Sequence, residues 1–581
     1  MTAFRASGLL RGGRWLIAVF LVFAGPAGVT ALARESREPD AAARMSPPEV
    51  PPVPVPADVG VGRLSTVDAD SAGVLTAEQG GFGASMWQGT RRSLVDALLP
   101  RLPVDTGSRA MRDLMRRLLL SAAGAPEGES APGSLAALRA KMLLAMGDFG
   151  GVEALLAATS ARAADPDLAQ IRLEALLLAG DNAGACAIAE DRIGEAGAVF
   201  WQKALIFCQA LAGEHEKAAL GVALLGEMGE VDPAFFTLVA ALAGEPGRID
   251  SLPDPTPLHL AMARAAKVML PADVVSSDHL AVLRVVAVAP NASAEVRLAA
   301  ADRAQAAGAL AADTLRQLYA GTPFEQQAAS GSKALAAGEG PHARALAYRS
   351  AVAAETPGAR AEAVARALKA GREQGRYGAT ALVYLPLVEG IPISPETMYF
   401  APEAIAALLV AGKREAAEDW YAALAASAEA DPQADAALLA AMPLAHLAWA
   451  ADSEGWDAAD LAAWWSSIRD SEGAGDRATR VYALLDATGV AVPEPLWEPL
   501  LGGAGRSTVA MPPAALLNRL AASAQAGRTG ETVLLALLAL AEGGPPATDT
   551  VTLGQVVRSL GAVGLEDEGR ALALEAVAAY R

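Results

Sequence analysis

The two cysteines, Cys186 and Cys208, are the residues whose type and spacing most specifically predict chemistry in this chain. Counting from the glycine of the preceding turn, Cys186 falls near the start of one helix pair's second helix, and Cys208 near the end of the next pair's first helix. Those two ends are neighbours in an antiparallel stack, so we expect a disulfide in an oxidising compartment. Closing a loop of about 23 residues would stabilise the fold by about 3 kcal/mol. The alternative is two separate buried thiols, because cysteine is among the most buried residue types.

The sequence contains no motif for a metal, a cofactor or an activated nucleophile. Its five histidines form no His-x-x-x-His pair, and no Cys/His cluster offers four ligands. Neither a Gly-x-Ser-x-Gly elbow nor a phosphate-binding Gly-Lys-Ser/Thr loop occurs. We therefore predict no enzyme activity, no cofactor and no metal. The alternative is a cell-envelope enzyme, or an enzyme accessory, acting on cell-wall polymer through carboxylates such as Glu403 or Asp419.

Arginines gather near the start of the chain, on an otherwise acidic protein. Segment 61–125 begins Gly-rich and then predicts two amphipathic helices, at about 88–99 and 107–122. These arginines have two interpretations: a polar helical cap on the first repeat, or a docking patch for an acidic partner. The candidates for partner binding are Arg91, Arg92, Arg112, Arg116 and Arg117.

Aromatic residues make up only 5% of the chain, and the tryptophans among them concentrate toward its C-terminus. Aromatic side chains usually fill a core, but some would be available to line a concave groove that binds an extended partner. The candidates for partner binding in this group are Trp420, Tyr421, Trp449, Trp456, Trp464 and Trp465.

The elements that must position these residues are helix pairs. Hydrophobic residues make up 53% of the chain, chiefly Ala and Leu, and alternating β-branched runs are scarce, which favours helix throughout. Glycines at the predicted turns, such as Gly180 and Gly213, lie 33 residues apart, and a period of this length is typical of helical repeats. The predicted pairs are Leu135–Met146 with Val152–Ala158, Asp167–Ala179 with Ala183–Ile193, and Val199–Ala212 with Lys217–Glu227.

The turn glycine followed five residues later by alanine (Ala185, Ala218 and Ala417) resembles the tetratricopeptide repeat, most clearly across 166–226 and 402–425. The chain is similar to a degenerate member of this family, with Leu173 and Leu176 in place of the glycine and aromatic residue of the first helix. The resemblance implies an all-α solenoid of stacked antiparallel helix pairs. It also implies protein or peptide binding on the concave surface.

The N-terminus resembles a secretion signal. Residues 1–33 combine a basic start, an apolar stretch from Trp15 to Phe23 and a small-x-small site at Ala31-Leu32-Ala33, so we expect cleavage after Ala33. The alternative is an uncleaved N-terminal membrane anchor facing the periplasm. Residues 34–60 are Pro-rich and predict an extended, disordered linker.

The formal net charge of −19 makes nucleic acid and anionic lipid unsuitable partners. We expect a periplasmic or secreted scaffold or adaptor that binds protein or peptide in the cell envelope, without membrane contact after signal cleavage. After the linker, the predicted domains are an Arg-rich helical cap (61–125), a first helical-repeat segment (134–245), an irregular helical segment (246–340) and a second helical-repeat segment (341–581).

Overall fold

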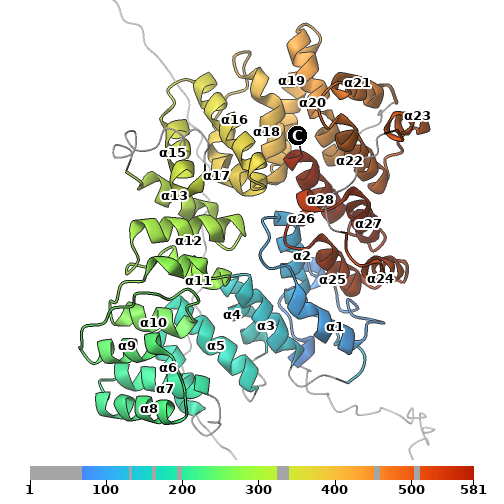
Figure 1. Ribbon diagram of the computed structural model, residues 1–581. Helices are drawn as coiled ribbons and strands as arrows, with labels where there is room; N and C mark the ends of the chain where they lie inside the picture. The colour runs from blue at the N-terminus through green and yellow to red at the C-terminus, as the bar shows by residue number, and fades with distance from the viewer. Residues whose placement is uncertain are drawn as a thin grey trace, which may run out of the picture. The chain divides into compact units, whose positions relative to one another are not determined.

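The computed structural model describes residues 69–129, 134–159, 165–192, 199–323, 339–449, 458–502 and 511–580. Within these ranges the protein is all-helical, with 27 α-helices and no strand, which confirms the all-α part of the predicted fold class (Figure 1). None of these helices combines the length and the apolar character that crossing a bilayer requires. The expected signal peptide (1–33) and Pro-rich linker (34–60) lie outside the described residues.

The Arg-rich segment forms the two helices expected from its sequence. The Ser108 hydroxyl accepts a hydrogen bond from the Met111 amide (3.1 Å) and so caps the second of them. Arg139 of the following helix donates to the carbonyls of Leu119 (2.7 Å) and Ser121 (2.9 Å), which holds the end of the second helix against the next one. The elements of this segment are η1 (Ala69–Ser71), η2 (Ala77–Gln79), α1 (Arg92–Leu98), η3 (Leu99–Arg101) and α2 (Arg109–Leu120).

From residue 134 the chain folds as helix pairs joined by short turns. Gly180 and Gly213 take the left-handed conformation after α5 and α7 (φ +85° and +77°), which favours glycine. Ala185 and Ala218, five residues after these glycines, are buried where each second helix meets its partner. The helices here are α3 (Leu135–Ala145), α4 (Phe149–Ala158), α5 (Pro166–Ala179), α6 (Asn182–Asp191), α7 (Val199–Leu211), α8 (His215–Glu227) and α9 (Pro233–Leu242).

The middle of the chain is helical as well, but it changes direction after α9. A Pro-containing connection leads to α10, which packs against α5 and α9 instead of continuing the series outward. The helices of this part are α10 (Pro257–Ala265), η6 (Ala272–Ser276), α11 (Leu280–Val286), α12 (Ala294–Ala306) and α13 (Ala312–Ala320).

The C-terminal part again consists of neighbouring helices that pack in pairs, including α16 with α17, α18 with α19 and α27 with α28. Its elements up to the middle of this part are α15 (Gly340–Ala353), α16 (Pro357–Glu373), α17 (Tyr377–Glu389), η7 (Met398–Phe400), α18 (Ala401–Val410), α19 (Arg414–Ala428) and α20 (Pro432–Trp449). The remaining elements are α21 (Ala458–Ile468), α22 (Ala474–Ala487), α23 (Glu494–Trp497), η8 (Glu498–Leu500), α24 (Ala514–Gln525), α25 (Thr529–Leu540), α26 (Gly544–Ala547), α27 (Thr550–Gly561) and α28 (Glu566–Ala579).

The two ends of the described chain meet. All described residues belong to one compact unit, in which α2 contacts α3 and α4 on one side and α25 and α28 on the other (Figure 1). The last helix, α28, also packs against α17, α18 and α20. The Arg-rich segment, expected as a cap at one end of the repeats, is therefore in contact with both the first and the last helices.

Candidate functional site

The predicted disulfide is present. Cys186 on α6 and Cys208 on α7 are bonded, with their Cα atoms 5.5 Å apart. The second helix of one pair is thereby linked covalently to the first helix of the next, as the antiparallel stacking argument required. The alternative of two separate thiols is wrong for this structure.

The arginines of α2 are aimed at the ends of other helices. The Arg112 guanidinium donates to the carbonyls of Ala307 (2.7 Å) and Met146 (3.1 Å), which lie just beyond the C-termini of α12 and α3. Carbonyls at a helix C-terminus carry partial negative charge, so a guanidinium stabilises both ends at once. Burial lowers the pKa of Arg112 to about 10, which still leaves it charged at neutral pH.

Two glycines make this arrangement possible. Gly308 and Gly412 follow α12 and α18 in the left-handed conformation (φ +72° and +76°). A Cβ atom at Gly308 would overlap the side chain of Arg112, and one at Gly412 would overlap that of Arg109. The backbone therefore favours glycine at both positions, and at Gly308 the middle of the Arg112 side chain also leaves no room for a Cβ atom.

The N-terminus of α2 is held by α28. The Glu575 carboxylate accepts a hydrogen bond from the Ala110 amide (2.9 Å) and another from the Ser108 hydroxyl. Burial raises the pKa of Glu575, against the opposing effect of these hydrogen bonds and of Arg109. A carboxylate at a helix N-terminus is favoured by the amides that point toward it, so this contact joins the two ends of the chain.

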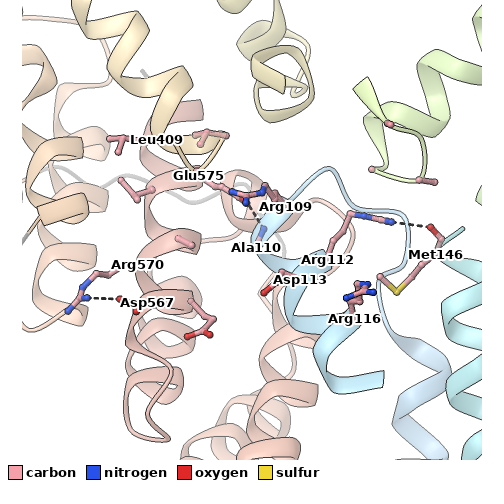
Figure 2. A pocket seen from close by; sticks show the side chains of 18 of the residues that line it. Arg109, Ala110, Arg112, Asp113, Arg116, Met146, Leu409, Asp567, Arg570 and Glu575 are labelled. Atoms are coloured by element: carbon pink, nitrogen blue, oxygen red, sulfur yellow. Dashed lines mark hydrogen bonds and ion pairs between the residues drawn. The ribbon is translucent and has the colours of Figure 1, made fainter. Parts of the chain in front are cut away.

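A cavity of about 840 Å³ opens beside these groups, and we call it the junction cavity (Figure 2). Most of the charges that line it are paired across it or along its walls, as in Arg116 with Asp148 (2.9 Å) and Arg570 with Asp567 (3.0 Å). Among the described residues no group of three metal-ligating side chains occurs. Its charged lining residues are Arg109, Arg112, Asp113, Arg116, Asp148, Arg284, Arg414, Asp567, Glu568, Arg570 and Glu575.

The five arginines predicted from the sequence to bind a partner are divided by the structure. Arg112 and Arg116 line the junction cavity, whereas Arg117 pairs with Glu568 at its edge. Arg92 is buried and paired with Asp70 and Asp96, each at 2.6 Å. Arg91 is exposed at the start of α1. Partner binding by these residues stays a prediction.

The predicted aromatic candidates lie in or against the core. Trp420 and Trp464 are buried and contact Phe400 and Tyr482 edge to face. Tyr421 and Trp449 contact each other with their rings tilted by 45° and the ring centroids 5.4 Å apart, and Trp465 packs against the core. Trp456 lies outside the described residues. None of the described candidates lines the junction cavity or the groove described next, and partner binding by them stays a prediction.

A second cavity, of about 550 Å³, lies along the first helices of three successive pairs, and we call it the hairpin groove. Its apolar lining includes Met142 of α3, Leu178 of α5, Phe200 of α7 and Val282 of α11. The Glu174 carboxyl lies among these apolar side chains and accepts a hydrogen bond from the Gln170 side chain (2.9 Å). Burial raises the pKa of Glu174. The groove thus offers apolar surface with a half-buried acidic group, Glu174, whose burial is partly offset by Gln170 and by Lys141 of the same lining.

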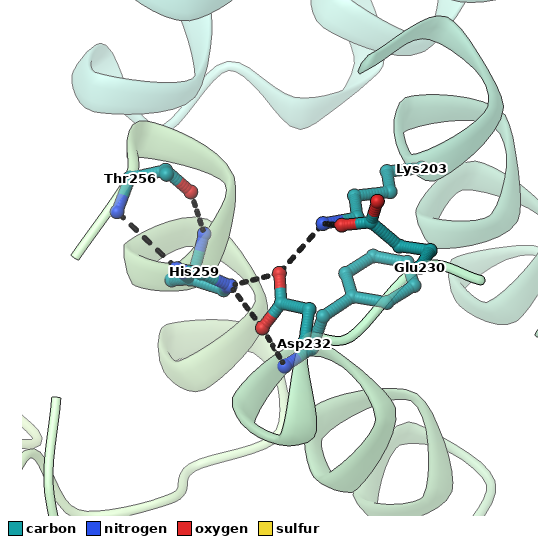
Figure 3. A network of polar contacts seen from close by, with 6 residues as sticks. Lys203, Glu230, Asp232, Thr256 and His259 are labelled. Carbon is teal, nitrogen blue, oxygen red and sulfur yellow. Dashed lines mark hydrogen bonds and ion pairs between the residues drawn. The ribbon is translucent and has the colours of Figure 1, made fainter. Parts of the chain in front are cut away.

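A polar network forms part of the lining of the groove (Figure 3). Asp232, the N-cap of α9, accepts hydrogen bonds from Lys203 (2.7 Å) and from His259 Nε2 (3.1 Å). The Nδ1 atom of His259 lies 3.3 Å from the Thr256 amide, which donates to it, so the hydrogen on the neutral ring belongs to Nε2. Both ring nitrogens are occupied, and the network is suited to holding the walls together, with no nitrogen left to act as a base.

The carboxylates considered for cell-wall chemistry are not close partners. Glu403 forms a two-point ion pair with Arg372 (2.6 and 3.1 Å), which in turn donates to the Ala578 carbonyl. Asp419 is exposed on α19. The carboxylates that do gather are those of the junction cavity, which sequence reasoning did not identify because they come from α2, α4 and α28.

The hairpin groove was also missed, although its signal was present in the sequence. Each first helix carries a polar or charged residue about one turn from a large apolar one, as with Glu174 and Leu178 or Phe200 and Lys203.

Comparison with protein-family models, with curated proteins and with solved structures finds no match for this chain.

Proposed function

We propose that this protein is an exported scaffold or adaptor that binds an extended protein or peptide segment in the hairpin groove. The observation that carries the proposal is the groove itself, lined by the first helices of three successive pairs. In a tetratricopeptide-like solenoid these helices form the concave face, which is the surface such proteins use for binding. The Cys186–Cys208 disulfide supports export, since disulfides persist in oxidising compartments.

The groove specifies what kind of segment it would hold. Met142, Leu178 and Phe200 offer apolar surface to large aliphatic or aromatic side chains. Glu174, whose pKa is raised by burial, would gain from a cationic group on the bound segment, because an opposite charge favours the ionised form of a carboxyl. We therefore propose a segment with apolar side chains and one Lys or Arg that reaches Glu174.

Site-specific crosslinking in cells tests this proposal. Replacing Phe200 by the photoreactive residue p-benzoylphenylalanine should give an adduct of the chain with a second protein, recovered in the envelope fraction. The matched control places the same residue at Val551, which is exposed and lies outside the groove. Deleting 61–125 is a poorer test, because α2 is packed between the first and last helices. Identical adducts at both positions, or none at Phe200, would contradict the proposal.

The cell-envelope enzyme remains the second candidate, because the junction cavity holds a carboxyl with a raised pKa among other carboxylates. Glu575 would be its proton donor. Release of soluble fragments from purified cell wall by the wild-type chain, lost in Glu575→Gln, would favour this candidate over the scaffold. No release by the wild-type chain would count against it.

A further inference from the structure

The outer face of α8 is apolar and uncovered. Leu220, Leu224 and Met228 are 63%, 52% and 57% exposed, and successive members are four residues apart, so they lie along one side of the helix. The opposite side, with Ala218 and Leu225, is buried. Scattered exposed apolar residues are ordinary on protein surfaces, but a continuous stripe on one helix indicates a contact surface.

The course of the chain explains why this face is bare. In the two preceding pairs, the second helix packs extensively on the first helix of the next pair, α4 on α5 and α6 on α7. α8 packs on α7 and makes only a few contacts with α9. After α9 the chain turns back as α10, against α5 and α9, so no described helix follows α9 outward beside α8 (Figure 1). The series of helix pairs therefore ends with the outer face of α8 not covered by another described helix.

The charges around the stripe indicate what would cover it. Residues 218–226 carry no charge, whereas Glu216 precedes this stretch and Glu227 follows it, both exposed. Lys217 is already paired with Glu214 (2.9 Å), and Glu230 with Lys203 (2.7 Å). The stripe is thus bounded by acidic groups at both ends. A second copy of this face, or an anionic lipid surface, would be repelled by them.

We propose that α8 docks an amphipathic helix of a partner protein, with aliphatic residues on one face and Lys or Arg near both ends. The bound helix would lie where the next helix of the series is missing, with its apolar face on Leu220 and Leu224 and its cations near Glu216 and Glu227. A helix that seats its apolar side against another helix gains chiefly from burial of these side chains, and the flanking charges select its partner.

Two synthetic helices of about 18 residues, long enough to span α8, serve as probes. Both carry the same Leu/Ala face, but one has Lys and the other Glu at its ends. Fluorescence anisotropy against the full-length chain should show saturable binding of the Lys peptide, and binding of the Glu peptide weaker by about tenfold or more. Leu220→Ser/Leu224→Ser should weaken the Lys peptide by about tenfold or more as well. The matched control, Val551→Ser, changes an equally exposed residue elsewhere and should leave binding unchanged.

The proposal fails if the Lys peptide does not saturate, or if the double variant binds it as the wild type does. It also fails if sedimentation shows a dimer that Leu220→Ser/Leu224→Ser disrupts, because a second copy would then be the occupant. Circular dichroism of the double variant excludes loss of fold as the cause of weaker binding. The crosslinking test at Phe200 addresses a different surface, so the two proposals stand or fall separately.

Discussion

At the scale of single residues, Asp232 links capping to charge pairing. Burial by itself would raise the pKa of Asp232, but hydrogen bonds from His259, Lys203 and the Phe235 amide hold that pKa well below its usual range. A carboxyl with a depressed pKa in the folded state stabilises the fold above its unfolded pKa, about 4, and that contribution disappears as the pH falls. The ammonium group of Lys203, which pairs with Asp232, also lies over the Phe235 ring, 5.4 Å from its centroid.

The change Asp232→Asn therefore has a pH signature. It keeps an N-cap side chain but removes the charge, and it should lower the free energy of unfolding by about 2 kcal/mol at neutral pH. The difference from wild type should shrink below about pH 4, where Asp232 of the unfolded chain takes up a proton while Asp232 of the folded protein stays charged. Urea unfolding at the two pH values measures this. Asp181→Asn is the control, because Asp181 caps α6 through the Gly184 amide (2.9 Å) and forms no ion pair with another described residue. An equal loss in both variants would contradict the argument.

At the scale of elements, the turns after the helices divide into two kinds. Gly213 has a positive φ, and nothing lies within 4 Å of the place where its Cβ would be. Gly308 has the same backbone conformation, but the side chain of Arg112 crosses it on the way to the ends of α3 and α12. A turn of the first kind only ends a helix. A turn of the second kind also packs against a side chain from a helix in another part of the chain.

Paired alanine substitutions separate these roles. Gly213→Ala should lower the free energy of unfolding by about 1 kcal/mol, the cost of a left-handed alanine. Gly308→Ala should lower it by about 1–3 kcal/mol more, because Arg112 must move away from the carbonyls it serves. Denaturant unfolding of both variants gives the comparison. If the two losses were equal, Arg112 would have no part in the requirement for glycine at 308.

At the scale of the whole molecule, the last helix, α28, holds the N-terminus of α2 in place. Ser108 and Glu575 are 467 residues apart in sequence and share a hydrogen bond, and Arg117 pairs with Glu568 on the same helix. Deleting α28 should therefore increase hydrogen exchange at the amides of α2, with the N-terminal amides affected most. Glu575→Ala should give a smaller increase confined to the start of α2. Unchanged exchange there in both variants would mean that α28 does not hold α2.

Local pattern was sufficient for the elements and for one long-range bond. The pairs beginning at Leu135, Asp167 and Val199 are found within three residues of their expected bounds, because apolar periodicity, capping residues and turn glycines act over a single turn. The Cys186–Cys208 bond was also predictable, since it joins neighbouring helix pairs whose stacking follows from their period. The secretion signal, the tetratricopeptide-like arrangement and the partner remain predictions.

What the sequence by itself determined, then, was an all-helical chain, its helix pairs and its disulfide. Only the tertiary structure decided that α2 lies between the first and last helices, that Arg112 serves two helix ends, and that α10 turns back and leaves α8 uncovered. These features depend on the directions of whole helices and on contacts between residues hundreds of positions apart. Such contacts leave no periodic pattern in the sequence, because each of them depends on single residues that lie far apart in the chain.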